Sequence, residues 1–147
     1  MPGQQRCSAL WCVLLLLLLC SACRRSYSYE ERVSTQLVKL FPTERLKLYQ
    51  RIVFVPNGGC AGCIQQAENF YLQSKGDSTT LFVFTNYISR KDLQIKLGKD
   101  LPANPNVWLD EDNILYFPKY PESLYPCLIV LSDGKISRFA NLDELLP

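Results

Sequence analysis

Histidine is absent from this 147-residue sequence. This excludes Ser-His-Asp and Cys-His catalysis and removes the commonest metal ligand. Neither sign of charge is in large excess, because 16 Lys and Arg residues balance 14 Asp and Glu residues to a net charge of +2. The sequence also lacks a long basic stripe, so we expect no nucleic-acid partner. Since 48% of the residues are hydrophobic and glycine and proline are ordinary in number, we expect one folded domain with a proper core.

A long membrane-spanning run is missing as well. Arg6 precedes an unbroken apolar run over residues 10–20, which leads into Cys20-Ser21-Ala22-Cys23. This layout is typical of a signal peptide, because the run is shorter than the roughly 20 apolar residues that a spanning helix needs. We therefore expect residues 1–22 to be a signal peptide.

The end of this segment resembles the lipobox of bacterial lipoproteins, in which small residues precede a cysteine. The resemblance implies that Cys23 is lipidated and becomes the mature N-terminus, so that the protein is anchored to a membrane and faces the periplasm or the cell exterior. Cys20 stands where a lipobox usually has leucine. A secreted protein and an uncleaved anchor therefore remain open as alternatives.

Cysteine is scarce beyond the signal peptide. Apart from Cys23, only Cys60, Cys63 and Cys127 remain. A structural zinc site needs four ligands, so three cysteines without histidine argue against one, and we expect neither a metal nor another cofactor. In the oxidising environment outside the membrane, a close thiol pair cycles or stays bonded.

Helical and strand patterns alternate along the rest of the chain. The sequence predicts helices over residues 29–40, from the C-x-x-C motif at residues 60–63 to about residue 72 or 74, and over residues 89–97 and 141–146. It predicts strands over residues 52–55, 80–85 and 107–109, and a hairpin over residues 125–139. Residues 43–50 fit either a strand or a short helix. This order predicts an α/β fold with a mixed central sheet flanked by helices and a C-terminal β-hairpin. Residues 23–50 are expected to form a helical extension, and residues 51–147 the main domain.

The motif Cys60-Ala61-Gly62-Cys63 stands where the apolar strand gives way to a helix. A C-x-x-C pair by itself fits a zinc site, an iron cluster, a structural disulfide or a redox pair. At a strand-to-helix junction, however, the first sulfur meets the unpaired N–H groups and the positive dipole end of the helix, which favour the thiolate. We therefore interpret the motif as a redox pair.

Residues 51–139 resemble the thioredoxin fold, and most closely the TlpA/ResA-like group of membrane-associated thiol-disulfide oxidoreductases. The resemblance rests on the apolar strand before the C-x-x-C, on Tyr125-Pro126 before a second apolar strand, and on the hairpin turn Ser132-Asp133-Gly134-Lys135. It implies that Cys60 is the nucleophile and Cys63 the resolving thiol. It also implies that Pro126 is a cis-proline facing the dithiol and that Tyr125 touches the substrate.

The sequence departs from this family around the cysteines. Gly59 replaces the usual tryptophan, the strand over residues 52–55 has no aspartate, and Gln66 stands where related proteins often carry glutamate. Glu68, on the same helix, is a weak candidate to take over the acid-base role. The glycines around the motif, Gly58, Gly59 and Gly62, either leave room for a substrate strand or form a flexible turn.

The sequence favours a membrane-anchored thiol-disulfide oxidoreductase. Its expected partners are exported proteins with thiols or disulfides, a membrane or periplasmic redox partner, and the lipid membrane. The alternative is a non-catalytic thioredoxin-fold accessory lipoprotein with a static Cys60-Cys63 disulfide. A weaker third hypothesis is a redox sensor that uses Cys127, although a lone cysteine in a buried strand more often acts as a small apolar side chain.

Overall fold

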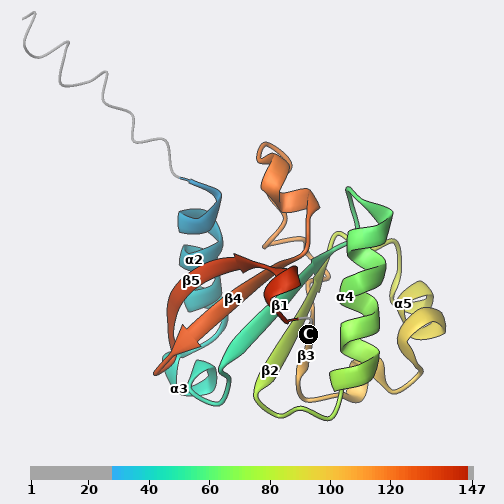
Figure 1. Ribbon diagram of the computed structural model, residues 1–147, viewed down its shortest axis with the longest axis horizontal. Coiled ribbons are helices and arrows are strands. Elements are labelled where there is room, and N and C mark those ends of the chain that lie inside the picture. The colour runs from blue at the N-terminus through green and yellow to red at the C-terminus, as the bar shows by residue number, and fades with distance from the viewer. Residues whose placement is uncertain (1–27, 146–147) are drawn as a thin grey trace, which may run out of the picture.

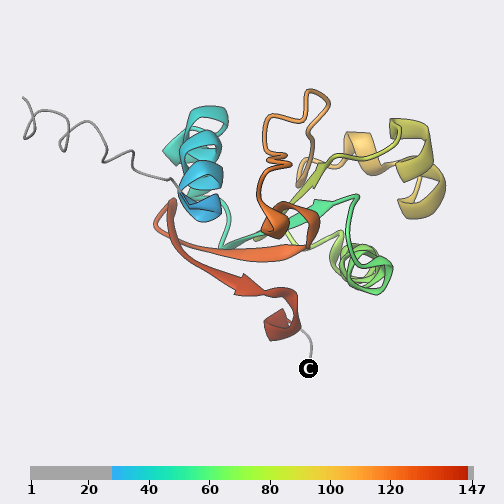
Figure 2. The ribbon, with the colours of Figure 1, turned by 90° about the horizontal axis from the view of Figure 1, so that it is seen from above.

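A computed structural model of the chain describes residues 28–145. The expected signal peptide and the lipidation site Cys23 lie outside these residues. A five-stranded sheet carries helices on both of its faces (Figures 1 and 2). The helices are α2 (Tyr29–Leu40), α3 (Thr43–Leu46), α4 (Ala61–Ser74) and α5 (Arg90–Leu97), and the strands are β1 (Arg51–Pro56), β2 (Thr80–Thr85), β3 (Val107–Leu109), β4 (Cys127–Ser132) and β5 (Lys135–Asn141). Three short 3-10 helices, η1 (Leu101–Ala103), η2 (Pro121–Leu124) and η3 (Leu142–Leu145), complete the order.

The sheet is mixed, with the strand order β3-β2-β1-β4-β5. β1 pairs in parallel with β2, and β2 pairs in parallel with β3. On its other side β1 pairs antiparallel with β4, which forms a hairpin with β5 that has one register shift between Val130 and Leu131. The predictions of a mixed sheet and a C-terminal hairpin are confirmed, although the order differs somewhat from the classic thioredoxin order.

Local signals explain where the helices begin. Ser28 caps α2 in a reciprocal pair of hydrogen bonds, because its hydroxyl accepts from the Glu31 N–H at 3.2 Å and its own N–H donates to the Glu31 carboxylate at 2.9 Å. The ambiguous residues 43–50 contain the short helix α3 and no strand. The predicted final helix is a 3-10 turn, η3, instead of an α-helix.

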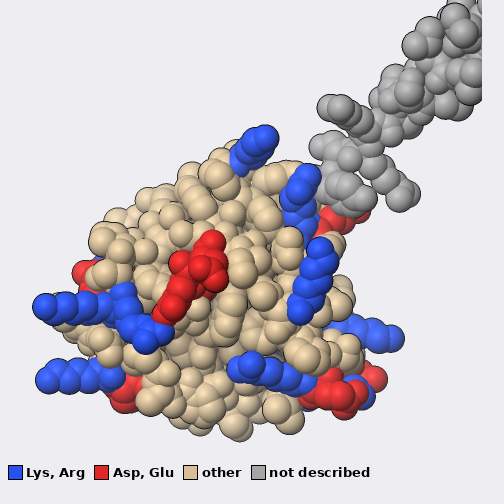
Figure 3. All heavy atoms as spheres, turned by 180° about the vertical axis from the view of Figure 1, so that it is seen from behind, with Lys and Arg blue, Asp and Glu red and all other residues tan. Residues whose placement is uncertain are grey.

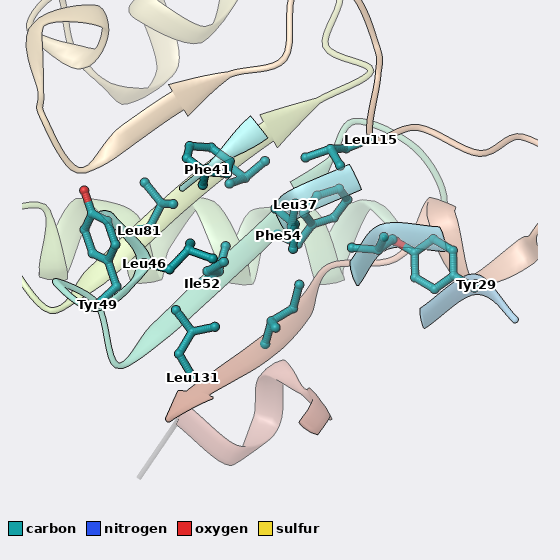
Figure 4. Close-up of a cluster of buried hydrophobic side chains, with 13 residues drawn as sticks. Tyr29, Leu37, Phe41, Leu46, Tyr49, Ile52, Phe54, Leu81, Leu115 and Leu131 are labelled. Atoms are coloured by element: carbon teal, nitrogen blue, oxygen red, sulfur yellow. The ribbon is translucent and has the colours of Figure 1, made fainter. Parts of the chain in front are cut away.

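One half of the core lies between the sheet and α2. Leu37 and Phe41 from this helix region pack with Ile52 and Phe54 of β1 (Figure 4). The long connection between β3 and β4 adds Leu115 to the same cluster. α2 therefore covers one face of the sheet, and residues 28–42 contribute to the folded domain itself.

The other half of the core lies between the sheet and α4 and α5. Val53 and Val55 of β1 point to this side, opposite to Ile52 and Phe54, because successive strand side chains alternate between faces. Tyr71 of α4 packs edge-on against Phe82 at a ring distance of 5.1 Å. β1 is thus buried on both faces, as expected for the strand that leads to the cysteine pair.

The surface opposite the view of Figure 1 carries basic and acidic side chains scattered among wide uncharged areas (Figure 3). In the part of the chain that the structure describes, none of the helices combines the length and the apolar character needed to cross a bilayer.

Candidate functional site: the cysteine pair at the start of α4

The end of β1 places Cys60 at the start of α4. Residues 57–59 turn the chain from the strand, and Cys60 takes the N-cap position with an extended backbone (φ −72°, ψ 115°). Its carbonyl accepts the first helical hydrogen bond, from the Ile64 N–H at 3.1 Å. The Cys60 side chain therefore stands beside the unpaired N–H groups of the first helical turn.

The two cysteines of the motif lie 2.9 Å apart and neither is in a disulfide. Cys60 is exposed, and Cys63 is partly buried one turn into the helix. A hydrogen bond from the Cys63 side chain, reinforced by the N–H groups of Cys63 and Gly62, lowers the pKa of Cys60. The same hydrogen bond, together with burial, raises the pKa of Cys63. Cys60 is therefore the better nucleophile, and Cys63 holds its proton.

Gly58 and Gly59 permit a close approach between this turn and the end of η2. Gly59 has a φ of +75°, and a β-carbon on it would lie 2.6 Å from the Leu124 carbonyl oxygen. A β-carbon on Gly58 would lie 3.0 Å from the Leu124 side chain. Leu124 thus occupies the β-carbon direction of both glycines, with its backbone over Gly59 and its side chain over Gly58. Gly59 and Gly62 are both exposed.

Tyr125 and Pro126 follow Leu124 directly. The expected cis-proline is not found, because residues 28–145 contain no cis peptide bond. Trans is the ordinary preference of an X-Pro bond, and Tyr125 has the extended conformation (φ −111°, ψ 140°) that is favoured before proline. The two residues line a cavity of about 460 Å³. Neither Cys60 nor Cys63 lines that cavity. Leu124, which precedes Tyr125, is the residue that approaches the turn before the cysteines.

Cys127 lies apart from the pair. It pairs with Phe54 in the sheet and packs against the core on the α2 side. Burial, with a smaller contribution from the charge of Glu30, raises the pKa of the Cys127 thiol to about 12. This environment agrees with the structural interpretation of Cys127.

Glu68 and Gln66 of α4, the two positions considered for acid-base assistance, have different neighbours. Glu68 is half-buried, burial raises its pKa, and the charges that act on it are those of Lys96 and Asp92 of α5. A role for Glu68 at the cysteines stays a prediction. Gln66 donates a hydrogen bond to the Asp143 carboxylate at 3.2 Å. The sequence pattern does not indicate this neighbour of the site, because Asp143 lies 77 positions from Gln66, in a segment for which the sequence predicts only a short helix.

Among residues 28–145, no group of three or more histidine, cysteine, aspartate or glutamate side chains is placed to hold a metal ion. The site shown by the structure is thus an asymmetric thiol pair in an α/β domain. Comparisons with protein families, with curated proteins and with solved structures find no match for the chain.

Proposed function

We propose that this chain is a thioredoxin-type thiol-disulfide oxidoreductase of the TlpA/ResA-like kind, which exchanges disulfides with exported proteins. One observation carries the proposal: the exposed Cys60 lies 2.9 Å from Cys63 at the start of a helix, and the hydrogen bond between them lowers the pKa of Cys60 and raises that of Cys63. Thiol-disulfide exchange needs this difference between the two pKa values, because the thiolate, and not the thiol, is the attacking species. The central strand and the C-terminal hairpin support the thioredoxin-like assignment.

The reaction runs in two exchanges. The Cys60 thiolate attacks a substrate disulfide, and one substrate sulfur leaves as a thiolate while the other stays bonded to Cys60. Cys63 then loses its proton and attacks the Cys60 sulfur. The Cys60-Cys63 disulfide forms and the second substrate sulfur leaves, so two electrons pass from the pair to the substrate. A thiol donor must reduce the pair again, and the reverse sequence oxidises a dithiol.

Trapping tests the exchange directly. In Cys63→Ser the second step is blocked, so disulfide-linked complexes with exported proteins should accumulate. A reducing agent should cleave these complexes and release the partners. Cys60→Ser should give none and serves as the matched control. Turnover of insulin by the wild-type chain, and its loss in both variants, completes the test. Wild-type protein that neither turns over insulin nor yields a trapped partner would rule the proposed activity out.

The second candidate is an accessory lipoprotein with a static disulfide. It is favoured by Gln66, whose amide stands one turn after Cys63 and cannot accept a proton as a carboxylate does. The reduction potential of the pair separates the two functions. A potential within the range of thioredoxin-fold catalysts, roughly −270 to −120 mV, fits exchange, whereas one below about −300 mV fits a structural disulfide.

Membrane attachment is a separate part of the proposal and rests on residues 1–23. If Cys23 carries lipid, Cys23→Ser should move the protein from the membrane fraction to the soluble fraction. Unchanged membrane association would contradict attachment through Cys23. A charge-preserving change next to it, Arg24→Lys, is the control.

A further inference from the structure

A carboxylate from the end of the chain lies on the Cys63 side of α4. Gln66 follows Cys63 by three residues, so the two side chains share one helix face. The Gln66 amide donates a hydrogen bond to Asp143 at 3.2 Å. Asp143 also acts electrostatically on the Cys63 thiol. In the described part of the chain, Cys60 and Asp143 are the two ionisable groups that act on Cys63 through their charge.

The fold holds Asp143 in this place from both sides. Leu142, the preceding residue, is 5% exposed and packs in the core cluster that contains Ala67 and Phe70 of α4. Glu144, the following residue, forms two hydrogen bonds with Arg138 of β5, at 3.1 and 2.6 Å. Figures 1 and 2 show η3 on the same side of the sheet as α4. The position of Asp143 is therefore set by anchored neighbours and by Gln66.

The second exchange requires a group that accepts the proton of Cys63. Cys63 must give up a proton to attack, yet its hydrogen bond with Cys60, its burial and the nearby charges all favour the protonated thiol. The strand before the motif has no carboxylate, and the charges that act on Glu68 come from α5. Asp143 is the carboxylate whose charge acts on Cys63, and its hydrogen bond to Gln66 places it beside the helical turn that follows Cys63.

We propose that Asp143 is the acid-base residue of the resolving step, positioned by its hydrogen bond to Gln66. When Cys63 attacks, its proton passes to the Asp143 carboxylate, the Cys60-Cys63 bond forms, and the bond between Cys60 and the substrate sulfur breaks. Asp143 then gives the proton to the departing thiolate or to water. In the reverse direction Asp143 returns the proton to Cys63. This inference rests on the proposed exchange activity and assigns the proton transfer that the exchange requires.

The test follows each exchange separately. The reduced full-length chain is mixed with an aromatic disulfide that releases a coloured thiolate twice, first when Cys60 attacks and again when Cys63 resolves the mixed disulfide. In Asp143→Asn we expect an unchanged first phase and a second phase about 100-fold slower near neutral pH, at the lower end of the usual range for lost general acid-base catalysis. The second phase should also become more steeply dependent on pH, because hydroxide must replace the carboxylate.

Two variants serve as controls. Asp143→Glu keeps the carboxylate and should recover most of the second-phase rate. Glu44→Gln removes a carboxylate on α3, which pairs with Lys47 and has no contact with the site, and should leave both phases unchanged. The unchanged first phase and a wild-type circular dichroism spectrum establish that each variant is folded.

A slower or a faster second phase in Asp143→Asn distinguishes a role in proton transfer from an effect of charge alone. If Asp143 acts only through its charge, its removal lowers the pKa of Cys63, and the second phase of Asp143→Asn becomes faster. A faster or unchanged second phase overturns the inference. The proposed function fails on a different result, the absence of insulin turnover and trapped partners, whereas a slow second phase in Asp143→Asn alone leaves that function intact.

Discussion

The two thiols of the motif differ in protonation because each has a different role in one hydrogen bond. Cys60 accepts the bond at the exposed start of α4, and Cys63 donates it from a partly buried position. Removing the Cys63 thiol should therefore change the pKa of Cys60. At this scale the structure makes two predictions, one for the pair and one for Cys127.

We predict that Cys63→Ala raises the pKa of Cys60, because the largest contribution to its lowering is the Cys63 side-chain hydrogen bond. Cys63→Ser keeps a donor at the same position and should preserve more of the lowering. The rate of Cys60 alkylation as a function of pH measures both values. Equal pKa values in the alanine and serine variants would show that the hydrogen bond is not the main cause.

Cys127 should react far more slowly than Cys60. Burial raises its pKa to about 12, so almost none of it is thiolate at neutral pH. With the reduced chain at neutral pH, mass spectrometry of iodoacetamide-treated protein should find Cys60 modified first and Cys127 modified only after unfolding. Early modification of Cys127 in the folded protein would revive the hypothesis of a third redox thiol.

At the scale of elements, short-range signals were enough to predict the five strands and the helices α2, α4 and α5, but they left α3 ambiguous and predicted a helix where η3 is a 3-10 turn. The capping box at Ser28, the apolar run of β1 and the Gly98 stop of α5 each act within a few residues. The contacts that complete the site connect distant residues. Gln66 and Asp143 are 77 positions apart, and nothing local indicates that they meet. The prediction of a cis peptide bond at Pro126 was wrong, because it came from the resemblance to the thioredoxin fold, whereas the local preference of an X-Pro bond is trans.

The turn between β1 and α4 depends on Gly59. Gly59→Ala should lower the free energy of unfolding by about 1–3 kcal/mol, because the added β-carbon meets the Leu124 carbonyl oxygen and the backbone has a positive φ. Gly76→Ala is the matched control, since a β-carbon there would meet nothing within 4 Å. Urea denaturation measures both. Equal effects of the two substitutions would contradict the close approach.

The start of β2 is joined to β1 through Asp77. Its carboxylate accepts hydrogen bonds from the Thr80 hydroxyl at 2.6 Å and from Arg51 at 3.0 Å, and also from the Thr79 hydroxyl and N–H. These bonds, that of Thr80 foremost, hold the pKa of Asp77 well below its usual range. The carboxylate therefore stabilises the fold at pH values above the usual aspartate pKa.

Asp77→Asn should lower the free energy of unfolding at neutral pH by about 1–3 kcal/mol, the range for hydrogen bonds to a charged group. The difference from wild type should shrink as the pH falls below about 4, because the Asp77 carboxylate of the unfolded wild-type chain then binds a proton while that of the folded protein, with its lowered pKa, does not. Glu44→Gln, which changes a side chain that is 83% exposed, should have little effect. A difference that is independent of pH would exclude the carboxylate as its source.

At the scale of the whole molecule, the sheet needs cover on both faces, and α2 supplies one of them. Leu37 is fully buried in the cluster of Figure 4, whereas its neighbour Val38 is 57% exposed. Leu37→Ala should lower the free energy of unfolding by about 2–5 kcal/mol through lost burial and a cavity. Val38→Ala should change it by less than about 0.5 kcal/mol. Chemical denaturation compares them, and equal effects would mean that α2 is not part of the core.

The central position of β1 has a consequence for the order of folding. β1 takes β2 as one neighbour from the next part of the chain, but its other neighbour is β4, and the turn before Cys60 rests on Leu124. Pairings between distant segments close slowly, because the loop between them must first be ordered. During synthesis the cysteine pair is made before both Leu124 and β4. The turn that carries the pair therefore gains its folded contacts only after those later segments have been added.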